Sequence, residues 1–177
     1  KNIKNDSKVT KKNDIFFAIE GKKNDGNKFV SEVLQKKASL AIVNRINKNC
    51  AISKQIKVKN SLNFLTKCSS IYRDNISAKV ISITGSCGKT TLKEMMGYVL
   101  KKISKTTYSP KSFNNKYGVP LSLFNLKQNN DFGILEVGMD KKGEIDNLTK
   151  IIKPDLGVIT NISYAHSKNF NNIKQIA

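Results

Sequence analysis

A lysine and two threonines follow a glycine-rich turn in the segment Thr84-Gly-Ser-Cys-Gly-Lys-Thr-Thr91. A turn of this kind presents backbone N–H groups to an anion, and a helix that begins there adds partial positive charge. Lys89 would reach the outer phosphates of a nucleotide, and the Thr90 hydroxyl would ligate Mg²⁺. These residue types in this order predict binding of a nucleoside triphosphate.

The chain on either side of the turn supports a phosphate-binding role. Residues 79–83 contain a short apolar run of strand type, and apolar residues at spacings of three and four then predict a helix. The general P-loop pattern has its first glycine at position 83, which is Ile here, so Gly85 makes a tighter loop. A strand before and a helix after the turn argue against a chance Gly-Lys-Thr in a lysine-rich chain. The residues expected on the buried face of this helix are Leu92, Met95, Met96, Val99 and Leu100.

Length and composition limit the class of protein. A chain of 177 residues allows one domain or two small ones, and a hydrophobic fraction of 38% is enough for a packed α/β core. No apolar run approaches the ~20 residues of a membrane span, and the first residues have no apolar signal-peptide core. Three scattered cysteines lack metal-site spacing and form an odd set, so we expect a cytoplasmic protein without disulfides.

A formal net charge of +19 raises the alternative of a basic nucleic-acid-binding module. The lysines are spread along the whole chain together with Asn and Ile, which is the composition that an AT-rich genome produces at tolerant surface positions. The aromatic fraction is 7%, and no stretch interleaves aromatic residues with lysine as a stacking platform does. We therefore expect no specific nucleic-acid binding, although this class stays open as an alternative function.

The order of the expected elements predicts an α/β fold in two domains, 1–77 and 78–177. Strands alternate with helices in the second domain, which indicates a mostly parallel, doubly wound sheet. Ligands bind beyond the carboxyl ends of such strands, where residues 84–91, 136–140 and 160–166 would meet. The expected strands are 14–19, 40–43, 79–83, 104–108, 131–137 and 155–160, and the expected helices are 29–38, 62–72, 92–100 and 144–152.

Five blocks of sequence, in one order, resemble the ATP-dependent Mur ligases of peptidoglycan synthesis, and most closely the branch that adds D-Ala-D-Ala. The resemblance runs over essentially the whole chain. It implies a small N-terminal α/β substrate domain followed by a truncated, mostly parallel P-loop ATPase sheet with flanking helices. The blocks are Asp6-Ser-Lys8 with Asn13-Asp-Ile-Phe-Phe-Ala-Ile-Glu-Gly21 and Asp25–Phe29, the turn 84–91 with Leu92–Met95, Ser112-Phe-Asn-Asn-Lys-Tyr-Gly-Val-Pro-Leu121, Leu135-Glu-Val-Gly-Met-Asp140 with Gly143-Glu-Ile145, and Thr160-Asn-Ile-Ser-Tyr-Ala-His166 with Phe170.

The resemblance also implies roles for individual residues. Lys89, Glu136 and His166 would be catalytic, and Thr90, Glu136 and His166 would hold Mg²⁺. Substrate would be bound by Ser7, Lys8, Asn114 and Asn115. ATP would be bound by Gly85, Ser86, Cys87, Gly88, Lys89, Thr90, Thr91 and Asn161.

The reaction that the resemblance implies is amide formation driven by ATP. A carboxylate of UDP-MurNAc-tripeptide attacks the γ-phosphorus to give an acyl phosphate, and the amine of D-Ala-D-Ala then displaces phosphate. Those two substrates are the expected partners, with no membrane insertion and a monomeric protein. Members of the family continue past the position of Ala177, so we expect little ligase activity from these residues alone.

Two further alternatives remain beside the nucleic-acid-binding module. A related branch of the family adds a single amino acid, but its usual Glu-Val-Ser-Ser-His run is Glu136-Val-Gly-Met-Asp140 here. Another kind of P-loop enzyme, such as a kinase or GTPase, is the second alternative. The Asn-Lys-x-Asp motif with which a GTPase reads its base is absent from the sequence.

Overall fold

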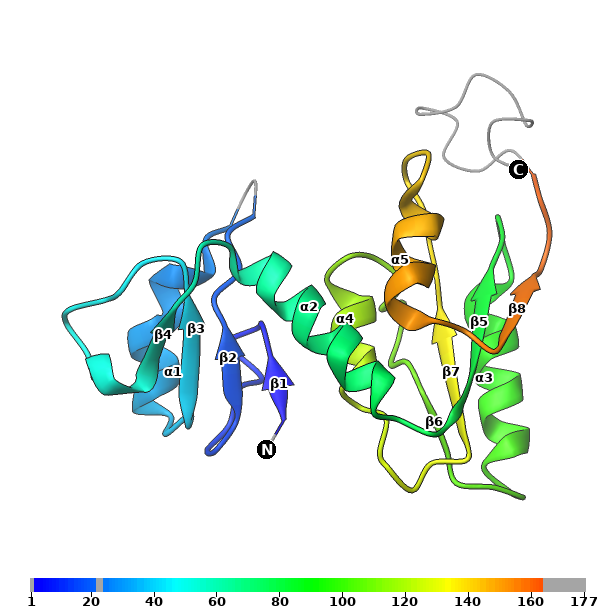
Figure 1. Cartoon of the computed structure of the whole chain (residues 1–177), viewed down its shortest axis with the longest axis horizontal. Coiled ribbons are helices and arrows are strands. Elements are labelled where there is room, and N and C mark those ends of the chain that lie inside the picture. The colour runs from blue at the N-terminus through cyan, green and yellow to red at the C-terminus, as the bar shows by residue number, and fades with distance from the viewer. Residues whose placement is uncertain (1, 22–23, 164–177) are drawn as a thin grey trace. The chain divides into compact units, whose positions relative to one another are not determined.

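The computed structural model describes residues 2–21 and 24–163 and divides the chain into two compact units, Lys1–Cys68 and Ser69–Ala177 (Figure 1). Each unit contains a four-stranded sheet, and neighbouring strands are parallel in both sheets. The α/β class expected from the sequence is therefore confirmed. Within the described residues, every helix is too short or too polar to cross a membrane.

The first unit has the strand order β1-β2-β3-β4. Its core forms where Phe16 and Ala41, on adjacent strands, pack against Val30 and Val33 of the helix between them, and all four are fully buried. A parallel strand–helix–strand crossover of this kind covers a sheet face that would otherwise be exposed. The elements are β1 (Ile3–Lys4), β2 (Ile15–Phe17), the 3₁₀ helix η1 (Gly26–Phe29), α1 (Val30–Gln35), β3 (Leu40–Val43), the 3₁₀ helix η2 (Ile52–Lys54) and β4 (Gln55–Lys57).

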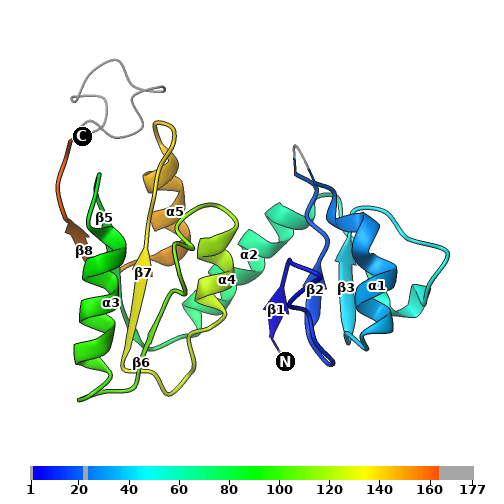
Figure 2. The same cartoon turned by 180° about the vertical axis from the view of Figure 1, so that it is seen from behind.

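The second unit has the strand order β6-β7-β5-β8, so the strand before the glycine turn lies inside its sheet. Helix α3 covers one face of this sheet, and helices α4 and α5 cover the opposite face (Figure 2). Its elements are β5 (Lys79–Thr84), α3 (Lys89–Leu100), β6 (Thr106–Tyr108), α4 (Gly118–Leu123), β7 (Phe132–Glu136), α5 (Glu144–Ile152) and β8 (Leu156–Ile159).

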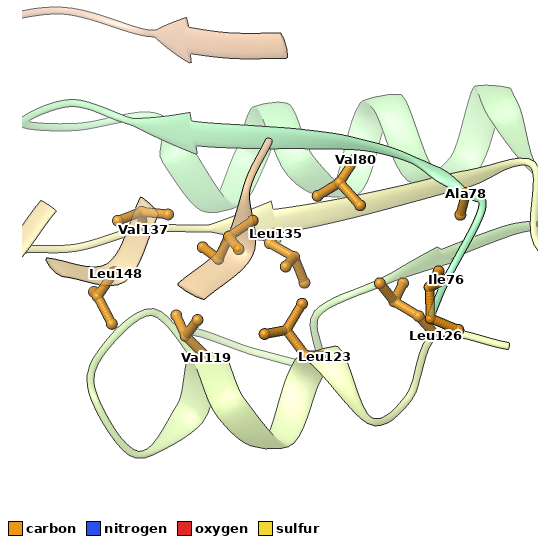
Figure 3. Close-up of a cluster of buried hydrophobic side chains, with 10 residues drawn as sticks. Ile76, Ala78, Val80, Val119, Leu123, Leu126, Leu135, Val137 and Leu148 are labelled. Carbon is orange, nitrogen blue, oxygen red and sulfur yellow. The ribbon is translucent and has the colours of Figure 1, made fainter. Parts of the chain in front are cut away.

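Alternate residues of β5 and β7 supply the two layers of the core. Val80 and Leu135 point toward Val119 and Leu123 of α4, as Figure 3 shows. On the opposite face, Ile81, Ile83 and Ile134 pack with residues of α3. Because Glu136 is two residues beyond Ile134, its side chain also lies on the α3 face.

The division between the units falls inside helix α2 (Ser61–Asp74), nine residues before the expected boundary at residue 77. The first half of α2 belongs to the first unit, where Ser61 Oγ donates to Asn44 Oδ1 at 2.6 Å. The second half is bound to the second unit. Tyr72 Oη donates to the Leu126 carbonyl at 2.6 Å, and Arg73 Nε donates to the Ile152 carbonyl at 2.8 Å. The two units are therefore joined by a continuous helix, α2, which ends at Asp74.

The buried face of α3 differs from the expected one. Leu92, Met96 and Leu100 pack on the sheet as expected, but Met95 and Val99 are 62% and 57% exposed, so their assignment to the core is wrong. The fully enclosed residues of this helix are instead Lys93 and Gly97. On α2, Ile71 is also exposed.

Candidate nucleotide-binding site

The turn between β5 and α3 depends on two glycines. Gly85 has φ +133°, and a Cβ atom there would lie 2.1 Å from Thr160 Oγ1. Gly88 has φ +77° and is the residue that precedes the first turn of α3. Since glycine has no side chain to cap a helix, and the first N–H groups of a helix lack acceptors within it, this end of α3 is open to an anion.

Lys89, the first residue of α3, folds back over the turn. Its Nζ donates to the Gly85 carbonyl at 2.6 Å and approaches the Ser86 carbonyl at 3.5 Å. The ammonium group therefore lies at the mouth of the turn, where two carbonyl oxygens hold it. Another acceptor can replace these two carbonyls, because the Lys89 side chain is half-buried and retains access to solvent.

Glu136 ends β7 beside the turn, opposite Ile83 in the parallel register. Its side chain is 1% exposed, and both of its carboxylate oxygens accept hydrogen bonds. Thr90 Oγ1 donates to Oε2 at 2.8 Å, and Asn114 Nδ2 donates to Oε1 at 2.8 Å. The structure thus brings together two residues that are 46 positions apart in the sequence and that we expected to share a metal.

The loop between β6 and α4, residues 109–117, supplies Asn114 and Asn115. The Asn114 carbonyl accepts from the Gly138 N–H at 2.7 Å, which ties this loop to the segment after β7. Asn115 Oδ1 accepts from the N–H groups of Tyr117 and Gly118 at 3.0 and 3.1 Å, at the start of α4. Both asparagine side chains therefore bind protein groups here, and their expected contact with substrate stays a prediction.

The segment after β8 lies along the glycine turn. Asn161 Oδ1 accepts from the Cys87 N–H, and the Asn161 carbonyl accepts from the Ser86 N–H, both at 3.0 Å. Thr160 Oγ1 donates to the Cys87 carbonyl at 2.6 Å. Asn161 is thus at the turn, as expected, but in this structure it occupies two of the N–H groups that we expected to face phosphate.

Three expected site residues are not among those described at the turn. His166 is outside the described residues. Ser7 and Lys8 belong to the first unit, where the buried Ser7 offers its carbonyl to Lys36 Nζ at 2.9 Å. Lys8 is exposed, and its N–H donates to Asp6 Oδ1 at 2.9 Å. Their roles in binding substrate stay predictions.

Comparison with known proteins shows which family the second unit resembles. Residues 83–177 match the Mur ligase middle domain. The chain belongs to the Mur ligase family. A UDP-N-acetylmuramoyl-tripeptide–D-alanyl-D-alanine ligase of Rickettsia prowazekii is 36% identical over 97% of this chain, which corresponds to 38% of that protein. The Bacillus subtilis protein of the same name is 31% identical over 99% of the chain and is matched over 38% of its own length.

Solved Mur ligase structures share the fold over nearly all of the chain. A crystal structure of MurF from Acinetobacter baumannii superposes with a TM-score of 0.90 at 34% identity, over 99% of this chain and 39% of that one. MurF from Thermotoga maritima, solved in complex with ADP, gives a TM-score of 0.86 at 32% identity, over 99% of this chain and 41% of that one. The chain therefore spans about two fifths of the length of these Mur ligases.

The donors beside the turn of this Mur ligase chain suit a hard divalent cation. The Thr90 hydroxyl and the Glu136 carboxylate are oxygen donors that already lie 2.8 Å apart. Within residues 2–21 and 24–163, no three His, Cys, Asp or Glu side chains form a metal cluster. The pair formed by Thr90 and Glu136 suits Mg²⁺, which usually keeps several waters and binds through one or two carboxylates together with substrate phosphates.

Proposed function

We propose that the chain provides the nucleotide-binding part, and a substrate-binding part, of a ligase that uses ATP to join D-Ala-D-Ala to UDP-MurNAc-tripeptide. The observation that carries the proposal is the Thr90–Glu136 pair beside the uncapped N-terminus of α3. The names of the curated relatives and the ADP in the Thermotoga maritima complex agree with it. The proposed reaction consumes ATP and a UDP-linked precursor, which places the protein in the cytoplasm, and we propose that it acts as a monomer.

The turn would hold the phosphates of ATP through charge and backbone N–H groups, and Asn161 would have to release the N–H groups of Ser86 and Cys87 for them to take part. Lys89 would exchange the Gly85 carbonyl for a phosphate oxygen, which needs a movement of one side chain only. The N–H groups at the start of α3, which have no acceptor within the helix, and the helix dipole would add to the attraction. This electrostatic work matters because the reaction brings a carboxylate, an anion, toward a polyanion.

Thr90 and Glu136 would hold Mg²⁺, with His166 as a further predicted ligand. When bound, the ion would neutralise charge on the phosphates and so lower the barrier to attack on the γ-phosphorus. Asn114 would keep the Glu136 carboxylate oriented through its bond to Oε1. A ligand that is held by an outer partner loses less freedom when the cation binds.

The first unit would bind the UDP end of UDP-MurNAc-tripeptide. The residues that we propose for this contact are Ser7 and Lys8, next to each other in the loop after β1. Lys8 is exposed and cationic, which suits a diphosphate. Support for this part of the proposal comes from the relatives' names and from the resemblance of the sequence blocks.

Titration of the chain with ADP by calorimetry, with and without Mg²⁺, tests the nucleotide site. We expect Mg²⁺ to tighten ADP binding, and Thr90→Val to lose that effect because the hydroxyl is replaced by a methyl group of similar size. A folded wild-type chain that binds ADP no better with Mg²⁺ would contradict the proposed site.

Assays on the product of the complete reading frame test the reaction. We expect phosphate release that requires both UDP-MurNAc-tripeptide and D-Ala-D-Ala. Equal release with a single amino acid in place of the dipeptide would assign the protein to the other branch of the family.

A further inference from the structure

Lys93 is a charged side chain in the core of the second unit. It is 0% exposed, although lysine is almost never fully buried without a partner. Its Nζ donates to the Lys111 carbonyl and lies 3.1 Å from Glu94 Oε1, on a side chain that is half exposed. Because a buried ammonium group destabilises a fold unless it is well bonded, the carbonyl of Lys111 is a specific partner rather than an incidental one.

The position of Lys93 connects it to the proposed cation site. It follows Thr90 by three residues, so both side chains leave the same face of α3. The carbonyl that it binds belongs to the loop 109–117, at a residue with φ +49°. A non-glycine residue in the left-handed region is uncommon and needs surrounding contacts to hold it there.

The contacts form a closed circuit of three chain segments. Helix α3 reaches the loop through Lys93, and the loop reaches β7 through Asn114, whose Nδ2 donates to Glu136 at 2.8 Å. Strand β7 returns to α3 through the Thr90–Glu136 bond of 2.8 Å. A shift of the loop away from α3 would therefore move Asn114 relative to the carboxylate that it orients.

We propose that Lys93 is a positioning residue of the nucleotide site. Its buried ammonium group holds the loop 109–117 so that Asn114 keeps Glu136 oriented toward Thr90. Lys93 acts through Asn114 and Glu136 and touches neither nucleotide nor cation. The inference rests on the proposed function, in which Thr90 and Glu136 are the oxygen pair for Mg²⁺.

The test compares ADP binding in EDTA with ADP binding in Mg²⁺, and the ratio of the two dissociation constants is the magnesium gain. Lys93→Met fills the same space without a donor, and we expect it to reduce the magnesium gain about 10-fold, as loss of an outer partner does in metal sites. Affinity for ADP in EDTA should stay as in the wild type, which also reports an intact fold. Lys102→Met removes the same charge from an exposed position just past α3 and should leave both constants unchanged.

A double variant separates positioning from simple core packing. Asn114→Ala should also reduce the magnesium gain, and Lys93→Met combined with Asn114→Ala should lose no more than the worse single variant, because both act on Glu136. Losses that multiply, or an unchanged gain in Lys93→Met, would overturn the proposal. If Lys93→Met fails to fold, Lys93→Leu replaces it with the same expected loss, since leucine also has no donor for the Lys111 carbonyl. Absence of a magnesium gain in the wild type would instead refute the proposed function.

Discussion

Glu136 is the residue at which helix, strand and loop meet. Its carboxylate is buried and accepts one hydrogen bond from α3 and one from the loop 109–117. A buried carboxylate that keeps its charge needs donors of this kind. The hydroxyl of Thr90 can turn away from it toward a cation, because a hydroxyl both donates and accepts.

Glu136→Gln tests the charge of this residue while keeping its size. We expect the variant to lose at least about 10-fold in magnesium gain, because an amide oxygen is a weaker ligand for Mg²⁺ than a carboxylate. Affinity for ADP without Mg²⁺ should stay the same or rise slightly, since a negative charge near the phosphates is removed. Calorimetry measures both, and Glu32→Gln on the first unit is the matched control. A full magnesium gain in Glu136→Gln would remove the residue from the metal site.

Lys89→Ala tests the ammonium group at the turn. The only partners of Lys89 that we find among the described residues are the carbonyls of Gly85 and Ser86, so its removal should leave the melting temperature within about 2 °C. Turnover of the complete enzyme should fall by orders of magnitude, because a preorganised positive charge at the phosphates is lost. Phosphate release and thermal melting are the two measurements. Unchanged turnover would show that Lys89 has no catalytic role.

Among the secondary-structure elements, β5 is bound at its start by the side chain of Asp155. Asp155 accepts from the Val80 N–H at 2.8 Å, from Lys79 Nζ at 3.0 Å and from Arg73 Nη2 at 3.1 Å. The Val80 N–H, and after it Lys79, lower the pKa of Asp155 below its usual 3.8, against the opposing effect of partial burial. The side chain of Asp155, the residue before β8, therefore connects the start of β5 with the end of α2.

The lowered pKa of Asp155 predicts how stability depends on pH. A carboxylate with a lower pKa in the folded state stabilises the fold above its unfolded pKa of 3.8, and that contribution is lost as the pH falls through the folded value. Denaturant titrations between pH 6 and pH 2.5 should show a smaller loss of unfolding free energy in Asp155→Asn than in the wild type. Asp146→Asn, on the exposed face of α5, serves as the control. Parallel pH curves for wild type and Asp155→Asn would contradict the assignment.

Some elements could be predicted from sequence and others could not, for local reasons. The strand at 40–43 and the helix at 144–152 have the expected bounds, because each has a clear apolar pattern and a stop signal, Pro154 in the second case. Strands β1 and β4 have two and three residues, too few for a pattern to show. Helix α4 begins with Gly118 and contains Pro120, and all of its residues are buried, so it has no polar face to reveal a helical period.

The candidate site was predictable only in part. The glycine turn and its lysine were evident, because their spacing is local and the chemistry of phosphate requires it. The bond from Asn114 to Glu136 spans 22 residues and depends on the path of the loop, which no local pattern reports. Lys93 was missed because a lysine within a helical pattern is normally assigned to the surface. A lysine between Leu92 and Met96, on the side of the helix that faces the sheet, was the available signal.

At the scale of the whole molecule, α2 is the element that both units share. Leu65 lies in its first half and is fully buried, and Arg73 lies in its second half with bonds to the Ile152 and Lys153 carbonyls. The exposed Lys67 lies between them, next to the division at Cys68. Each unit thus relies on one half of a continuous helix.

A proline at position 67 should weaken both units together. Lys67→Pro interrupts the helix at a cost of about 3 kcal/mol or more, whereas Lys67→Ala should change stability by less than about 0.5 kcal/mol. Amide hydrogen exchange of β3 and of β7 reports on the first and second unit separately. We expect faster exchange in both strands for Lys67→Pro. Faster exchange in β3 alone would show that the second unit does not depend on the continuity of α2.

The shared helix also sets an order of events during synthesis. The first half of α2 can join its core as soon as it is made, because β2 and β3 precede it. The second half cannot, since the carbonyls that receive Tyr72 and Arg73 come 54 and 79 residues later in the chain. As the chain leaves the ribosome, Arg73 can at first reach only the nearby Ile76 carbonyl, and the remaining bonds of Tyr72 and Arg73 form once Leu126 and then Ile152 have been translated.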